Sequence, residues 1–206
     1  LIFHYTGMRT EKGAIKRLTN YKSEVSSHYL IKENGEIITL VPDLYIAWHA
    51  GRSKWKKHEF LNKNSIGIEI TNPGHSYGYK KFPKQQILSL IKLTKFLISK
   101  YRINKKNILG HSDIAPERKK DPGEKFPWKY LSKNNIGYWH CLDQKILNKN
   151  RILKINNLQK NLFYKDLYKI GYSKKIPLNL KYSKNNYLIK ITKAFQRRFR
   201  PEIVDG

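Results

Sequence analysis

The sequence predicts an α/β domain with a central mixed sheet flanked by helices, followed by a small all-α module. Up to Trp139, short apolar strand patterns alternate with helical patterns, which is typical of α/β domains. Residues 83–101 carry apolar side chains at helical spacing and can cover such a sheet. After Trp139 the chain becomes polar and rich in lysine, and two amphipathic helical segments follow.

The expected elements follow from these patterns in chain order. We expect strands at 1–5, 28–33, 36–41, 46–50, 65–70 and 107–110, and helices at 9–19, 83–101, 152–167 and 187–199. The Asn34-Gly35 pair predicts a hairpin between two of the strands, because both residues tolerate positive φ. Residues 112–128 have no regular pattern and favour a functional loop, while 142–151 resemble a linker. The last 55 or so residues are few for a free-standing core, so this part is expected to dock on the first.

Composition restricts the function classes. Of the 206 residues, 42 are basic and 15 acidic, which gives a formal charge of +27. The 33 lysines are spread along the chain and only 9 residues are arginine, which argues against a dedicated nucleic-acid binder. The single Cys141 excludes an internal disulfide framework and a cysteine-based zinc finger. The best apolar run, 87–98, is interrupted by Lys92 and Lys95, so no transmembrane segment is expected.

Polar residues stand where strands should carry apolar ones. His4 lies in LIFHYTG, Glu69 in SIGIEI, and His111 at the end of the strand in ILGHSD. Two histidines and a carboxylate at strand ends resemble a zinc site with a fourth position for water. Asp121, ten residues after His111, is the natural third ligand. Taken singly, each residue has a structural alternative: a hydrogen-bonded core histidine for His4 and an ion pair for Glu69.

Five segments occur together in one order: FHYTG, SSHYLIKENGEI, LVPDLYIAWHAG, NSIGIEITNPG and GHSDIAPERKKDPGEKFPW. This series resembles the zinc-dependent N-acetylmuramoyl-L-alanine amidases of the type-2 amidase family, which is related to peptidoglycan-recognition proteins. The resemblance covers residues 1–139 and is strongest to the AmpD and AmiD branch. It implies that one zinc ion per chain is bound by His4, His111 and Asp121. It also implies that Glu69 is the catalytic carboxylate and Lys119 the catalytic lysine.

One position departs from the family pattern. Phage amidases carry a catalytic tyrosine just before the histidine of the second strand, and here that position is Ser27. Tyr29 follows the histidine instead, so its side chain should point to the opposite face of the sheet. Tyrosine is therefore left out of the expected mechanism.

The C-terminal part also resembles a known module. The Leu158-Gln159 pair, Gly171-Tyr172, the AFQRRFRP run and the terminal Val-Asp-Gly resemble a helical peptidoglycan-binding domain. The resemblance therefore implies an amidase domain at 1–141 and a wall-binding module at 142–206. A helical cap that only stabilises the first domain is the alternative.

The implied substrate is peptidoglycan or its muropeptides, and the implied reaction is hydrolysis of the amide joining N-acetylmuramic acid to L-alanine. Lower-ranked substrate contacts are expected from His28, His49, Trp48 and Asn72. A recognition module without turnover and a basic nucleic-acid binder are the competing hypotheses. We expect a monomer in the periplasm or outer envelope of a bacterium, with the cytoplasm as an alternative. Because the first residue is Leu, we expect a fragment or processed form whose targeting segment is not visible.

Overall fold

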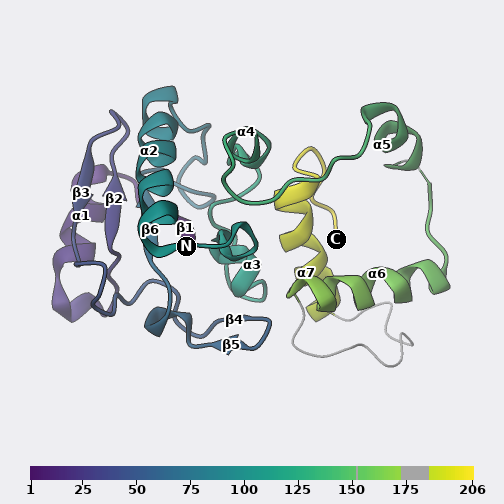
Figure 1. The fold of residues 1–206 in the computed structure, drawn as a ribbon, viewed down its shortest axis with the longest axis horizontal. Helices are drawn as coiled ribbons and strands as arrows, with labels where there is room; N and C mark the ends of the chain where they lie inside the picture. Colours follow the sequence, from purple (N-terminus) through teal and green to yellow (C-terminus); the bar gives the residue numbers. More distant parts are fainter. Residues whose placement is uncertain (152, 173–185) are drawn as a thin grey trace.

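The fold is built on one mixed sheet (Figure 1). The computed structural model describes residues 1–151, 153–172 and 186–206. The sheet has the strand order β3-β2-β6-β1-β7, in which β2 and β3 are antiparallel and the other pairs are parallel. Its strands are β1 (Ile2–Tyr5), β2 (Tyr29–Ile31), β3 (Ile37–Thr39), β6 (Gly67–Ile70) and β7 (Leu109–Gly110).

A two-stranded hairpin and several helices complete the described part of the chain. The hairpin consists of β4 (Lys54–Trp55) and β5 (His58–Glu59). The helices are α1 (Glu11–Thr19), α2 (Lys84–Tyr101), α3 (His111–Ile114), α4 (Trp128–Lys133), α5 (Gln144–Arg151), α6 (Asn157–Ile170) and α7 (Asn186–Phe199). The expected fold class, a mixed sheet flanked by helices with a helical part after it, is confirmed. No helix in the described ranges is long and apolar enough to cross a membrane.

Strand alternation gives the sheet two different faces. On one face, Phe3, Ile68 and Ile70 pack with Leu90 and Leu97 of α2 in the main hydrophobic core. Each of these five side chains is fully buried. The neighbours of these strand residues point to the other face, which leaves that face for polar side chains and for the C-terminal helices.

The second hydrophobic cluster joins this other face to the C-terminal helices. Ile2 of β1, Trp55 of β4 and Ile114 of α3 pack with Leu167 of α6 and Ile191 of α7. Figure 1 shows α7 standing beside α3, with α6 running below it. The C-terminal part therefore docks on the α/β part, as the small size of its own core predicts.

A buried ion pair fixes this docking. The Arg198 guanidinium donates to Asp113 Oδ2 at 2.7 Å and lies 4.0 Å from the centroid of the Trp128 ring. The Tyr172 hydroxyl donates to Asp113 Oδ1 at 2.6 Å, and the Gly110 N–H donates to Oδ2 at 2.8 Å. Asp113 is 1% exposed and Arg198 is 4% exposed, so neither charge is compensated by bulk water. Helix α3 is thus tied to α7 through a carboxylate whose bonds are all made within the protein.

Three sequence-based expectations are wrong. Residues 46–50 were expected to be a strand, but they form an irregular segment, because Trp48 exchanges backbone and side-chain hydrogen bonds with Ser26 instead of joining a ladder. Residues 142–151 were expected to be a linker, but most of them form α5. The segment 112–128 was expected to be irregular, yet its start belongs to α3 and its end begins α4. Residue 152, the first of the expected helix 152–167, lies outside the described residues.

The buried ion pair gives a stability prediction. Arg198→Met removes the partner of a buried carboxylate and should lower the free energy of unfolding by about 3–5 kcal/mol. The double variant Arg198→Met/Asp113→Asn should recover part of this loss, because no uncompensated charge remains. Arg200→Met is the matched control: Arg200 pairs with the exposed Asp205 at 3.4 Å, so its loss should cost about 1 kcal/mol or less. Urea unfolding measures the stability of all three variants. If Arg198→Met lost no more stability than Arg200→Met, the stabilising role of the buried ion pair would be contradicted.

Candidate active site

The site lies on the sheet face opposite α2, at the carboxyl ends of β1, β6 and β7. His4 in β1 pairs in register with Glu69 in β6, so the two side chains lie on the same face. His111 follows β7 directly and opens α3. Asp121 is brought to this helix by a backbone hydrogen bond of 2.8 Å from the Ser112 N–H to its carbonyl.

Three potential ligand atoms converge here. The Nδ1 atoms of His4 and His111 are 2.9 Å apart, and Asp121 Oδ2 lies 3.1 Å and 3.0 Å from them, respectively. All three residues are buried, and together they form a group whose ligand atoms could hold one metal ion. Donor atoms in tetrahedral zinc sites, with bonds of about 2.0–2.1 Å, lie roughly 3.3 Å apart, so the observed spacing fits such an ion.

Hydrogen bonds behind the cluster set the imidazole tautomers. His111 Nε2 lies 3.1 Å from the carbonyl oxygen of Ala50, so Nε2 carries the proton and donates it. The Nδ1 lone pair of His111 is therefore free and points at the cluster. Metal-binding histidines are commonly held by such a bond from the ring nitrogen that does not bind the metal.

A second histidine does the same for His4. His4 Nε2 lies 3.0 Å from His49 Nδ1, and His49 Nε2 lies 3.4 Å from the carbonyl oxygen of Ser65. With that carbonyl as the terminal acceptor, His49 donates from Nε2 and accepts at Nδ1 from His4. His4 Nδ1 is then unprotonated and available for a metal. Burial, together with the neighbouring His4 and His28, lowers the pKa of His49 well below its ordinary value and keeps it neutral.

Gly67 makes room for this relay. A Cβ on Gly67 would lie 2.3 Å from Cγ of His49, so any side chain there would displace the ring. The Gly67 N–H also donates to His28 Nδ1 at 3.1 Å, while His28 Nε2 bonds to the Tyr45 carbonyl at 3.0 Å. Both nitrogens of His28 are thus used to hold the loop behind the site.

The charges within the cluster match a metal site. Burial, with a contribution from the neighbouring His111, lowers the pKa of His4 to about 4, so His4 is neutral near pH 7. Burial alone would raise the pKa of Asp121, but the charges and hydrogen bonds of His111 and His4 hold it well below its usual range. Two imidazole nitrogens and one carboxylate oxygen therefore face one point, where a divalent cation could bind them.

Glu69 stands beside this cluster with a free carboxylate oxygen. Its Oε2 is buried and has no hydrogen-bond partner in the described part of the chain. Burial, with a contribution from Asp121, raises the pKa of Glu69 to about 8, while Lys119 acts in the opposite direction. A carboxyl group with this pKa can take up and release a proton near neutral pH.

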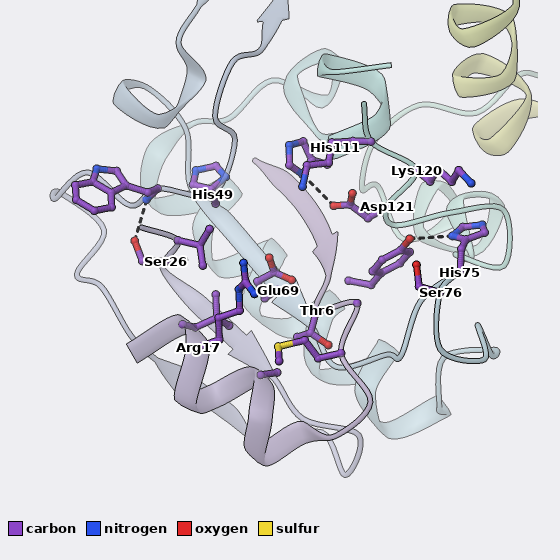
Figure 2. Close-up of a pocket in the computed structure, with 18 of the residues that line it drawn as sticks. Thr6, Arg17, Ser26, His49, Glu69, His75, Ser76, His111, Lys120 and Asp121 are labelled. Atoms are coloured by element: carbon purple, nitrogen blue, oxygen red, sulfur yellow. Dashed lines mark hydrogen bonds and ion pairs between the residues drawn. The ribbon is translucent and has the colours of Figure 1, made fainter. Parts of the chain in front are cut away.

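These groups open into one groove of about 500 Å³. Figure 2 shows Glu69 and Asp121 at its centre, with His49 on one side and His75 on the other. Trp48 also lines the groove and is 53% exposed, so its ring face is available to a ligand. Lys119 lines the groove next to the cluster.

The structure does not bring every expected contact residue to the groove. Asn72 is fully buried, accepts from the Gly74 N–H through Oδ1, and donates to the Lys80 carbonyl through Nδ2. His28 and Asn72 are absent from the groove lining, whereas His49 and Trp48 belong to it. The Tyr29 hydroxyl bonds to Asp43 and does not line the groove, in keeping with its expected direction.

Sequence reasoning missed several lining residues. Arg118 lines the groove and donates from its guanidinium to the carbonyl oxygens of Ala50 and Arg52. Tyr5 and His75, which also line it, are joined by a hydrogen bond of 2.8 Å between the hydroxyl and Nδ1. Their positions depend on loop packing, and no sequence pattern marks them.

The relay behind His4 gives a prediction for metal binding. His49→Ala leaves the Nε2 proton of His4 without its acceptor and frees the ring to rotate, so metal affinity should fall about 10–100-fold. Competition with a coloured chelator measures the dissociation constant. His58→Ala, in the exposed strand β5, is the control and should leave affinity unchanged. Equal affinities in the two variants would contradict the positioning role of His49.

Glu69 gives a pH prediction for the metal-free protein. Between pH 4.5 and about 8 the folded protein holds a proton on Glu69 that the unfolded chain releases. Wild type should therefore lose stability as the pH rises through this range, by roughly 5 kcal/mol in total. Glu69→Gln cannot ionise, so its free energy of unfolding should match that of wild type near pH 4.5 and exceed it near pH 8. The raised pKa of Glu69 would be contradicted if urea unfolding gave the same stability difference between Glu69→Gln and wild type at both pH values.

Comparison with known proteins agrees with this geometry. Residues 1–124 match the family described as N-acetylmuramoyl-L-alanine amidase, Amidase_2. The chain is 43% identical over 151 residues to N-acetylmuramoyl-L-alanine amidase AmiD of Escherichia coli, covering 68% of this chain and 54% of that protein. It is 41% identical over 114 residues to the 1,6-anhydro-N-acetylmuramyl-L-alanine amidase AmpD of Haemophilus influenzae, covering 54% of this chain and 60% of that protein.

A solved structure extends the likeness to the whole chain. The structure of E. coli AmiD with the substrate anhydro-N-acetylmuramic acid-L-Ala-D-γ-Glu-L-Lys aligns with a TM-score of 0.80 and 34% identity. The alignment covers 100% of this chain and 81% of that one. Against the curated relatives, the chain spans between 54% and 60% of their length. From its matched residues and its fold, the chain belongs to the N-acetylmuramoyl-L-alanine amidase family.

Proposed function

We propose that the chain is a zinc-dependent amidase that hydrolyses the bond between N-acetylmuramic acid and L-alanine. The observation that carries this proposal is the pairing of a complete ligand cluster with a free, buried carboxylate. His4, His111 and Asp121 offer three ligand atoms, and Glu69 stands beside them in an open groove. A recognition module without turnover has no need for a proton-accepting group at that position.

Zinc fits the donor set better than harder cations do. Two imidazole nitrogens and one carboxylate oxygen form the ligand set of open catalytic zinc sites, whereas Mg²⁺ and Ca²⁺ prefer oxygen ligands. His4 and His111 would bind through Nδ1 and Asp121 through Oδ2. When bound, zinc polarises an amide carbonyl and lowers the pKa of a coordinated water.

Glu69 and Lys119 supply the remaining chemistry. Glu69 takes the proton from the attacking water on its free Oε2 and later delivers it to the departing alanine nitrogen. The Lys119 ammonium, which lines the groove beside the cluster, stabilises the negative charge that develops on the carbonyl oxygen. Nearby positive charge favours the ionised form of Glu69, so a bound metal would bring its pKa below the metal-free value.

The substrate is proposed from the groove and from the relatives. The groove volume of about 500 Å³ suits a sugar with a short peptide, and Trp48 offers an exposed ring face for a sugar ring. The AmiD structure carries a muropeptide with an anhydro sugar, and AmpD proteins are named for anhydro substrates. Peptidoglycan and its muropeptides, including anhydro forms, are the proposed substrates. We propose no specific nucleic-acid partner.

The C-terminal helices are proposed to hold the enzyme on the cell wall. We propose that the chain divides into an amidase domain at 1–141 and a wall-binding module at 142–206. By binding the wall, the module would raise the local concentration of substrate. The shared hydrophobic cluster and the pair of Asp113 with Arg198 add a structural role, because α7 supports the helix that carries His111. Attachment to the wall favours the periplasm or outer envelope, and we propose that the chain acts as a monomer.

Hydrolysis of a defined muropeptide tests the proposal. Metal-free protein reconstituted with one equivalent of zinc should release L-alanyl peptide from anhydro-N-acetylmuramyl-L-Ala-D-γ-Glu, as followed by mass spectrometry. Chelation should abolish this activity and added zinc should restore it. Glu69→Gln should still bind zinc but lose turnover by on the order of a hundredfold or more, because it cannot accept a proton.

A matched control separates chemistry from folding. Gln86 is a buried polar residue that bonds to backbone carbonyls away from the groove, and its variant Gln86→Glu should affect stability more than zinc-dependent turnover. Full activity of the chelated protein would exclude zinc catalysis. Near wild-type turnover by zinc-loaded Glu69→Gln would show that another group moves the proton.

A further inference from the structure

The groove carries more positive charge than the reaction uses. Four basic residues line it, and the only acidic side chains in its lining are Glu69 and Asp121. Lys119 and Arg118 already have roles: Lys119 is assigned to the reacting carbonyl, and Arg118 is bonded to backbone carbonyl oxygens. The remaining two are Arg17 and Lys120.

Arg17 is the cation best placed to meet a ligand. It stands in the last turn of α1, the helix that forms the groove wall facing Glu69. Figure 2 shows its side chain extending from α1 into the groove toward Glu69. The residue is exposed, and its guanidinium has no hydrogen bond or ion pair with any residue of the described chain.

Four apolar residues line the groove together with Arg17, and we call them the apolar slot. Ala14 and Leu18 of α1, with Met8 and Val25 from the adjoining loops, line the groove on the same side. An apolar wall next to an unpaired guanidinium suits a small aliphatic side chain followed by a carboxylate. The planar fork of arginine matches a carboxylate through two parallel hydrogen bonds, which the single ammonium of Lys120 cannot form.

We propose that Arg17 binds the free α-carboxylate of the γ-linked D-glutamate in the substrate's stem peptide. This inference rests on the proposed function. The peptide bound to AmiD has the order L-Ala-D-γ-Glu-L-Lys, so a free carboxylate follows one residue after the alanine. The alanine methyl would then face the apolar slot and the carboxylate would face Arg17.

The length of the peptide sets how far the carboxylate lies from the scissile amide. An extended chain advances about 3.3–3.6 Å per residue, so a group two residues beyond the scissile amide lies roughly 7 Å from it. A peptide that runs from the ligand cluster along the α1 wall would bring its carboxylate toward Arg17, whose side chain extends into the groove (Figure 2). Arg17 therefore contributes to binding and specificity and takes no part in moving the proton.

Two substrates that differ only at this carboxylate test the inference. One is N-acetylmuramyl-L-Ala-D-γ-Glu-L-Lys, and the other carries D-isoglutamine in place of the D-glutamate, so that its α-carboxylate is an amide and its γ-carboxyl is still linked to lysine. Wild type should prefer the acid through a lower KM. Arg17→Met should raise the KM for the acid roughly tenfold, with kcat nearly unchanged, and should leave the KM for the amide almost as it was. Arg17→Lys should recover part of the preference, because it keeps the charge without the fork.

Lys16 supplies the matched control. It is the preceding residue of α1, is exposed and does not line the groove, so Lys16→Met removes the same charge from the same helix. This variant should keep the wild-type preference for the acid. The inference would be overturned if Arg17→Met behaved like Lys16→Met, or if both substrates lost affinity equally. It would also fail if amidation of the peptide's C-terminus, rather than of D-glutamate, removed the effect of Arg17.

Binding without turnover separates this inference from the proposed function. In zinc-loaded Glu69→Gln protein, calorimetry should give a dissociation constant for the acid that rises roughly tenfold when Arg17→Met is added. If the enzyme hydrolyses neither substrate, yet this binding difference is seen, then the proposed function fails and the role of Arg17 stands. If the enzyme hydrolyses both substrates without discriminating at the carboxylate, then the proposed function stands and the role of Arg17 fails.

Discussion

The convergence of two imidazole lone pairs and one carboxylate is the constraint on which the rest of the structure depends. His4 Nδ1, His111 Nδ1 and Asp121 Oδ2 lie within about 3 Å of one another in a buried place. Without a cation, such a grouping costs free energy, because acceptors face acceptors and water is excluded. Each surrounding bond fixes one member: Ala50 fixes His111, His49 fixes His4, and the backbone of Ser112 fixes the Asp121 loop.

The alternation of the central strands separates this site from the core. Phe3 and Ile68 point into the apolar layer under α2, while their neighbours His4 and Glu69 point to the opposite side. A polar, strained centre can therefore sit on a rigid sheet without disturbing its hydrophobic face. The same opposite face accepts the C-terminal helices, where the bond from Arg198 to Asp113 holds α3 and with it His111. The C-terminal helices and the cluster of His4, His111 and Asp121 thus share a structural support.

Much of the site could be predicted from the sequence, because the signals that mark its residues come from their immediate neighbours in the chain. His4 and Glu69 interrupt apolar strand patterns, and His111 ends one, so each is marked by its neighbours in the chain. The long helix α2 and the hairpin at Asn34-Gly35 were predicted for the same reason, since periodicity and turn chemistry are local properties.

What could not be predicted depends on contacts between distant segments. His49 lines the groove as expected, but its bonds to His4 and Ser65 were not predicted, because they require the irregular path of residues 46–50 and the absence of a side chain at Gly67. The bond of Arg198 to Asp113 joins residues 85 positions apart, and no periodicity reports it. Figure 2 shows Arg17 extending from α1 into the groove, and this direction depends on where α1 lies in the fold.

Anomalous X-ray scattering at the zinc absorption edge, from crystals of the zinc-loaded protein, tests the central claim most directly. We expect one peak per chain, within bonding distance of His4 Nδ1, His111 Nδ1 and an Asp121 carboxylate oxygen, with the His4 Nε2 to His49 contact intact. A peak bound through Nε2 of either histidine, or a peak outside this cluster, would contradict this expectation.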